Sequence, residues 1–96
     1  MRVISKRPLR EFWSLHPASR AMLEDWYYKA RRVSAAHFAE LKRTFGSADY
    51  VDGLTIFDVG GNHYRLVAII HYDKQRIYVR RVMMHSEYDR DNWRNP

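Results

Sequence analysis

The sequence predicts an α+β fold, in which an N-terminal strand and helices pack on an antiparallel β-meander that ends in a short helix or loop. Two patterns support this class. Apolar residues recur at helical spacing in the first half, whereas the second half is rich in β-branched and aromatic residues between turn signals. A chain of 96 residues has room for one layer of helices on one sheet, so we expect a single domain over residues 1–96.

The first half begins with a strand and continues with helices. Residues 2–5 are strand-like, and Pro8 suits the first turn of a helix that reaches about Leu15. A second helix is expected from about Ala18 to Val33, and Pro17 separates it from the first.

A third helix is expected over SAAHFAELKRTF, residues 34–45. Its apolar residues form one stripe at helical spacing, Ser34 is placed to cap the first turn, and Gly46 is placed to end the helix. The aromatic residues of these helices are best explained as packing against the sheet.

Three strands are expected in the second half: LTIFDV, HYRLVAIIHY and RIYVRRVMM. Gly60-Gly61-Asn62 separates the first two, and Asp73-Lys74-Gln75 separates the last two. The segment HSEYDRDNW, residues 85–93, is polar with two aromatic residues and is expected to lie outside the core.

The alternation along the middle strand gives each residue a face. Even positions from Tyr64 to Tyr72 are apolar, so Arg65 is expected on the opposite, exposed face, where it need not be buried. A two-residue turn at Lys74-Gln75 would pair residues whose numbers sum to 149. Ile69 would then lie opposite Arg80, and His71 opposite Tyr78. The polar face would gather Arg65, His71, Tyr78 and Arg80, and the apolar face Ile77, Val79 and Met83, with Arg81 at a bulge or edge.

The charge and the composition limit the function. Seventeen Lys and Arg residues against eleven Asp and Glu give a net charge of +6, which favours polyanionic or strongly acidic partners. The chain has no cysteine, which excludes disulfides and thiolate chemistry. The N-terminal segment lacks an apolar signal region and no run is long enough to span a bilayer, so we expect a cytoplasmic protein without membrane contact.

The polar face has the residue types that a metal-free ribonuclease needs. Arginine binds phosphate oxygens through a planar fork of donors, histidine transfers protons near neutral pH, and tyrosine transfers a proton or stacks on a base. Each residue also has a structural explanation: Arg65 as a surface arginine, His85 as a cap, and Lys42 as part of a solvated helix face. Glu87 and Asp89 can form ion pairs with Arg90 or Arg94. No ligand spacing indicates a metal site, and no cofactor is expected.

The segment FDVGGNHYRLVAIIHYDKQRIYVRRVMMHSEYDRDNW resembles the HigB family of bacterial toxins. The likeness runs over about residues 54–93. It consists of the turn Val59-Gly60-Gly61-Asn62, the arginine at position 65, and the strand end His85-Ser86-Glu87-Tyr88-Asp89.

The resemblance implies a RelE-like fold and a ribosome-dependent mRNA endonuclease, encoded beside an antitoxin with a helix-turn-helix. The reaction would be a metal-free attack of the 2′-oxygen on the adjacent phosphate. Arg65 would bind the scissile phosphate, and His85 and Tyr88 would transfer protons or hold the substrate. Asn62, Lys42, Tyr78 and Arg80 are candidate RNA contacts, of which Arg80 is a second phosphate ligand and Asn62 is first of all a turn residue. Operator DNA would be contacted only through the complex with the antitoxin.

Two alternatives stay open on the sequence alone. A basic αβ domain can dock on ribosomal or other structured RNA without cutting it, and its binding would then depend steeply on salt. An adaptor that binds an acidic protein would also explain the positive charge.

Overall fold

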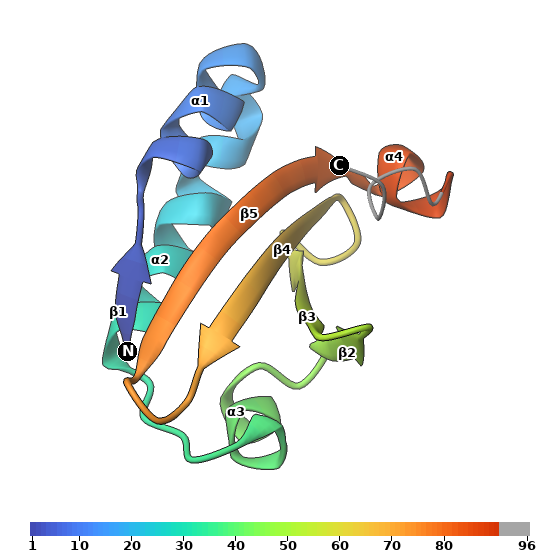
Figure 1. Cartoon of the computed structure of the whole chain (residues 1–96). Helices are drawn as coiled ribbons and strands as arrows, with labels where there is room; N and C mark the ends of the chain where they lie inside the picture. Colours follow the sequence, from blue (N-terminus) through green and yellow to red (C-terminus); the bar gives the residue numbers. More distant parts are fainter. Residues whose placement is uncertain (91–96) are drawn as a thin grey trace.

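The computed structural model of the chain describes residues 1–90, and the predicted α+β class is confirmed. Five strands form one sheet in the order β1-β5-β4-β3-β2, and α1 and α2 lie along one side of it (Figure 1). The elements are β1 (Arg2–Ile4), α1 (Arg7–Leu15), α2 (Arg20–Arg32), α3 (Phe38–Thr44), β2 (Asp49–Val51), β3 (Leu54–Val59), β4 (Tyr64–His71), β5 (Arg76–Met84) and α4 (His85–Asp89). None of the helices formed by residues 1–90 is long and apolar enough to cross a membrane.

The sheet contains one strand that the sequence did not reveal. Strand β2 has three residues and pairs antiparallel with the start of β3 across a two-residue turn, Asp52-Gly53, in which both residues have positive φ. Strands β3, β4 and β5 form the predicted meander, and β1 pairs parallel with the first residues of β5. The sheet is therefore mixed, with one parallel pair at its edge.

The predicted helices are present, but one cap is wrong. Pro8 lies in the first turn of α1, and a short 3₁₀ turn at Pro17–Ser19 separates α1 from α2. Residue Ser34 does not begin a helix. Helix α3 begins at Phe38, and the Nδ1 atom of His37 accepts the N-terminal cap hydrogen bond from the backbone N–H of Glu40 at 3.4 Å.

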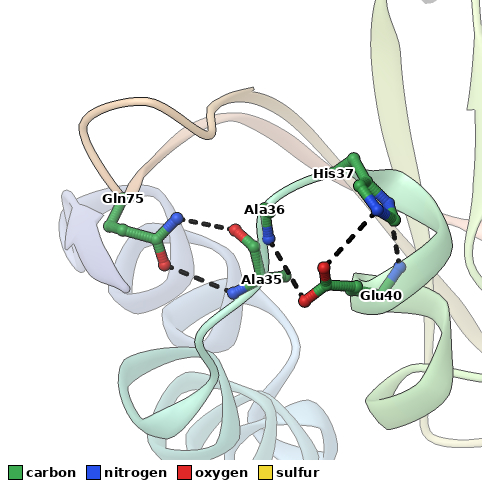
Figure 2. A network of polar contacts seen from close by, with 5 residues as sticks. All are labelled: Ala35, Ala36, His37, Glu40 and Gln75. Carbon is green, nitrogen blue, oxygen red and sulfur yellow. Dashed lines mark hydrogen bonds and ion pairs between the residues drawn. The ribbon is translucent and has the colours of Figure 1, made fainter.

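The segment between α2 and α3 stays extended, and the side chain of Gln75 binds its backbone (Figure 2). The side chain of Gln75 donates to the carbonyl oxygen of Ala35 at 2.6 Å, and its own oxygen accepts from the N–H of Ala35 at 3.3 Å. Gln75 lies in the turn between β4 and β5 with φ of 52°. This amide pair fixes the helix linker to the meander and ends α2 before residue 34.

The register of β4 and β5 differs from the prediction. Ile69 lies opposite Tyr78 and His71 opposite Arg76, so the pairs sum to 147, because the connection is a four-residue loop over residues 72–75. A shift of two keeps each side chain on its predicted face as far as Val79. A bulge at Arg80 then changes the alternation, and Met83 lies on the face of Arg65, contrary to the prediction.

Each face of the sheet has its own apolar cluster. The larger cluster lies between the sheet and the helices and includes Leu23, Trp26, Phe57 and Leu66. The smaller one lies on the opposite face and is formed by Ile56, Val67 and Met83, with Val51, Leu54 and Tyr88 packed against it. Tyr88 belongs to the terminal segment, so the expectation that this segment lies outside the core is wrong for that residue. Residues 91–93 of the same prediction lie outside the described residues.

Candidate functional site

Arg65 lies on the predicted face of the sheet, but it is buried. In the ladder it stands between Asp58 of β3 and Met83 of β5, and its side chain is 9% exposed. The expectation of an exposed arginine is wrong because this face is not open to solvent at Arg65. The second apolar cluster and α4 lie on the same face. A buried guanidinium requires acceptors for its N–H groups.

Three acceptors hold the guanidinium of Arg65. Its Nε atom lies 3.2 Å from Oδ1 of Asp58, its Nη2 donates to Oδ1 of Asn62 at 2.6 Å, and its Nη1 donates to the carbonyl oxygen of Tyr64 at 3.1 Å. The ring of Tyr88 lies over the guanidinium carbon at 5.6 Å from the ring centroid, a cation–π distance. Of the five N–H groups of an arginine, two remain, one on each Nη atom, without a partner among residues 1–90.

Helix α4 follows β5 without a loop and brings His85 and Tyr88 to this end of the sheet (Figure 1). The backbone N–H of His85 donates to the carbonyl oxygen of His63 at 3.0 Å, which ties α4 to the turn before Arg65. The carboxylate of Glu87 accepts from the N–H of Met84 at 3.3 Å and closes the first turn. Glu87 therefore caps its own helix. The sequence had suggested an ion pair with Arg90 or Arg94 instead, and Arg94 lies outside the described residues.

The imidazole of His85 is oriented by Asp89 of the same helix. Its Nε2 lies 3.1 Å from Oδ2 of Asp89, while its Nδ1 is buried and has no hydrogen-bond partner among residues 1–90. A carboxylate that faces Nε2 favours the tautomer that carries its proton there. The pair is half exposed, so its proton can exchange with a bound molecule.

Four of the seven predicted site residues gather at one end of β4: Asn62, Arg65, His85 and Tyr88. The turn that holds Asn62 has the predicted geometry, since Gly60 and Gly61 both have positive φ, at 65° and 67°. The side-chain oxygen of Asn62 is used by Arg65, so its structural role is direct.

The other three predicted residues lie elsewhere. Tyr78 stands opposite Ile69, four residues along β4 from Arg65 and thus roughly 13 Å away, and its ring contacts His71 at a centroid distance of 4.9 Å. The ammonium of Lys42 donates to the carbonyl oxygen of Ala48 at 3.0 Å, beside α3 at the far end of the sheet. Arg80 occupies the bulge and lines a groove with α1.

Asp58 is the residue that sequence reasoning missed. It is the direct cross-strand neighbour of Arg65 and its ion-pair partner, with a side chain that is 27% exposed. The signal was available. A four-residue turn over residues 60–63 pairs Val59 with Tyr64 and therefore Asp58 with Arg65.

The assembled groups suit the chemistry of a phosphodiester. Two guanidinium N–H groups can bind two phosphate oxygens, an oriented histidine can move a proton, and the ring of Tyr88 lies against the guanidinium. Among residues 1–90, no three His, Cys, Asp or Glu side chains gather in a way that would hold a metal ion.

Comparison with known proteins identifies the family of the chain. The family HigB_toxin, described as RelE-like toxic component of a toxin-antitoxin system, matches residues 19–91. The mRNA interferase toxin HigB of Escherichia coli (strain K12) is 32% identical over 95 residues, which cover 93% of this chain and 88% of that protein. The mRNA interferase HigB of Escherichia coli O6:H1 is 29% identical over 93 residues, which cover 94% of this chain and 90% of that protein. The chain therefore belongs to the HigB toxin family, the RelE-like toxic components of toxin-antitoxin systems.

Proposed function

We propose that residues 1–96 form a single toxin domain that cuts mRNA on the ribosome. The relatives are named mRNA interferases, which supports RNA cleavage as the activity of this chain as well. The observation that carries the proposal is the meeting of Arg65, His85 and Tyr88 at one end of the sheet, with a guanidinium that keeps two N–H groups for a ligand.

The proposed reaction is attack of the 2′-oxygen on the adjacent phosphorus, with release of the 5′-oxygen. One group takes the 2′-hydroxyl proton and another protonates the leaving oxygen. Arg65 donates its two remaining N–H groups to non-bridging oxygens when the ring of Tyr88 turns away from the guanidinium. His85 moves one of the protons, with Asp89 orienting its ring, and Tyr88 holds the substrate or moves the other.

Further RNA contacts would lie outside this centre. Asn62 keeps its amide N–H groups for RNA while its oxygen positions Arg65. Arg80 is exposed on the bulge, and Tyr78 and Lys42 lie farther along the molecule. We propose them as contacts to the nucleic-acid backbone or bases, with Lys42 exchanging its bond to Ala48 for a phosphate.

The proposal also defines the partners. The protein would act in the cytoplasm on ribosome-bound mRNA without a metal ion, and a helix-turn-helix antitoxin would neutralise it. Contact with operator DNA would come only through that complex.

Primer extension on mRNA after brief induction tests the activity. Wild type and Ser86→Ala, a control at an exposed position in α4, are expected to give new 5′ ends that depend on translation. His85→Ala removes a proton-transfer group and should reduce these ends by about 10²-fold or more. Arg65→Ala should reduce them by about 10²-fold through the loss of a phosphate ligand. Circular dichroism at matched soluble levels must show that both variants fold.

Two results would contradict the assignment. Undiminished 5′ ends in His85→Ala would remove His85 from the chemistry. Growth arrest without new ends in the wild type would instead indicate the non-catalytic RNA-binding module.

A further inference from the structure

A cleft of about 460 Å³ opens between α2 and the glycine turn, and Asp58, the ion-pair partner of Arg65, is among its lining residues. Its walls include Ala21, Met22 and Trp26 of α2, Phe45, and Asp58 to Gly61 at the end of β3. We propose that this cleft binds an extended polypeptide segment with a basic side chain, supplied by the antitoxin. The inference rests on the proposed toxin function only for the identity of that partner.

The edge of β3 offers backbone groups for such a segment. Strand β2 begins at Asp49 opposite Ile56, so β3 has no outer neighbour from Phe57 to Val59 among the described residues. The two-residue turn at Asp52-Gly53 closes on the hydrogen-bonded pair of Val51 and Leu54. By alternation, Ile56 and Asp58 also direct their N–H and C=O groups outward. Asp58 therefore presents one free donor and one free acceptor, as an added strand requires.

A second unused donor belongs to a residue that lines the cleft. Trp26 is 4% exposed and lines the cleft, and its indole N–H has no hydrogen-bond partner among residues 1–90. Buried N–H groups normally have a partner, and a peptide carbonyl is an acceptor of the right kind. A polypeptide can thus satisfy Asp58 and Trp26 together, while an apolar side chain rests against Met22 and Phe45.

The charge of the cleft distinguishes a polypeptide from RNA. Its ionisable lining consists of two carboxylates, Asp25 and Asp58, and one ammonium, Lys29. Each carboxylate forms an ion pair, Asp25 with Lys29 at 3.3 Å and Asp58 with Arg65 at 3.2 Å. Together with Arg65, the lining groups carry no net charge, and the one lining ammonium that a phosphate would meet is already paired with Asp25. A basic side chain would meet less repulsion here than is expected elsewhere on a chain with a net charge of +6.

The test measures the affinity of the purified cognate antitoxin for variants of the whole toxin. Ala21→Trp fills the cleft from an exposed position, and Ala39→Trp adds the same bulk on the exposed side of α3. Asp25→Lys reverses a charge in the cleft, and Asp73→Lys makes the same change in the exposed turn after β4. We expect the two cleft variants to raise the Kd at least 10-fold and the two controls to change it less than 3-fold.

Hydrogen exchange locates the contact independently. Amides of residues 57–61 should gain protection in the complex with antitoxin, while those of the β4–β5 turn, residues 72–75, should not. Equal Kd values for cleft variants and controls, or no protection at 57–61, would overturn the proposal. Protection of 57–61 by RNA, or by self-association of the toxin alone, would overturn it in favour of that occupant. Primer extension with the same variants separates the two proposals, because Ala21→Trp should cut mRNA normally whether or not the antitoxin binds it.

Discussion

Arg65 has a structural role that precedes any catalytic one. Its guanidinium is buried in an ion pair with Asp58, and Asn62 and the carbonyl of Tyr64 accept two of its N–H groups. The same contacts fix the position of the guanidinium. A ligand would therefore meet a fork that is already in place, which reduces the ordering needed on binding.

The ion pair between Asp58 and Arg65 should contribute to the free energy of unfolding. Asp58→Ala leaves a buried guanidinium without its carboxylate, and we expect a loss of about 1–3 kcal/mol, limited by the partial exposure of Asp58. Urea unfolding measures it, and Asp73→Ala, an exposed control, should change stability by less than about 0.5 kcal/mol. In an Arg65→Met background the same Asp58→Ala change should cost much less. Additive losses in the double variant would show that the pair is not coupled.

Sequence reasoning placed Arg65 on the right face but missed its burial. Alternation fixes the face of a strand residue, whereas burial depends on what else covers that face. Here Tyr88 of α4 covers it, from a segment whose polar composition suggested a solvated end. Asp58 was missed because its pairing with Arg65 depends on the length of the turn between β3 and β4.

At the scale of elements, the glycine turn brings two constraints together. Gly60 and Gly61 both have positive φ, but only at Gly60 would a Cβ collide with the thioether of Met22 in α2. A Cβ on Gly61 would meet no atom within 4 Å. The first glycine therefore also permits the close approach of helix and turn, while the second serves the backbone alone.

This difference predicts unequal costs of two alanine substitutions. Gly61→Ala should lower the free energy of unfolding by about 1–2 kcal/mol through left-handed strain. Gly60→Ala should lower it by about 1 kcal/mol more, because Met22 must leave its rotamer. Thermal melting of the two variants would measure the difference in their stability. Met22→Ala should recover the additional stability lost in the Gly60→Ala variant, and it should have little effect on the Gly61→Ala variant. Equal losses of stability at the two glycines would contradict the contact between Gly60 and Met22.

The elements that the sequence predicted well are those with long periodic patterns. Helices α1 and α2 and strands β3 to β5 were expected, and their bounds differ by a few residues. Strand β2 is too short to show a pattern, and the start of α3 is set by the contact between Gln75 and Ala35, which no local signal contains. The register error arose from a turn two residues longer than assumed.

At the scale of the whole molecule, titration of one partly buried tyrosine should affect stability at high pH. Burial of the hydroxyl raises the pKa of Tyr72 above its ordinary value, a hydrogen bond with Thr55 lowers the pKa to a smaller extent, and Tyr50 adds a small increase. The contact with Thr55 is weak, since the hydroxyl has no partner of ordinary hydrogen-bond geometry. Because the unfolded chain ionises first, the contribution of Tyr72 is complete below its unfolded pKa and falls as the pH rises through the folded pKa.

Tyr72→Phe should remove that contribution. Its free energy of unfolding should decline less steeply than that of the wild type above about pH 10, while stability near pH 7 changes little. Urea unfolding over a pH series would measure this. Tyr28→Phe, at an exposed tyrosine, should follow the wild-type curve. A parallel decline of wild type and Tyr72→Phe would show that Tyr72 ionises equally in both states.

The parallel pairing of β1 with β5 delays maturation of this protein during its own synthesis. Residues 2–4 leave the ribosome first, yet their partners are residues 76–78, so the edge strand waits for most of the chain. Met83, His85 and Tyr88, which complete the surroundings of Arg65, are made later still. The surroundings of Arg65 are therefore complete only after nearly the whole chain has been made.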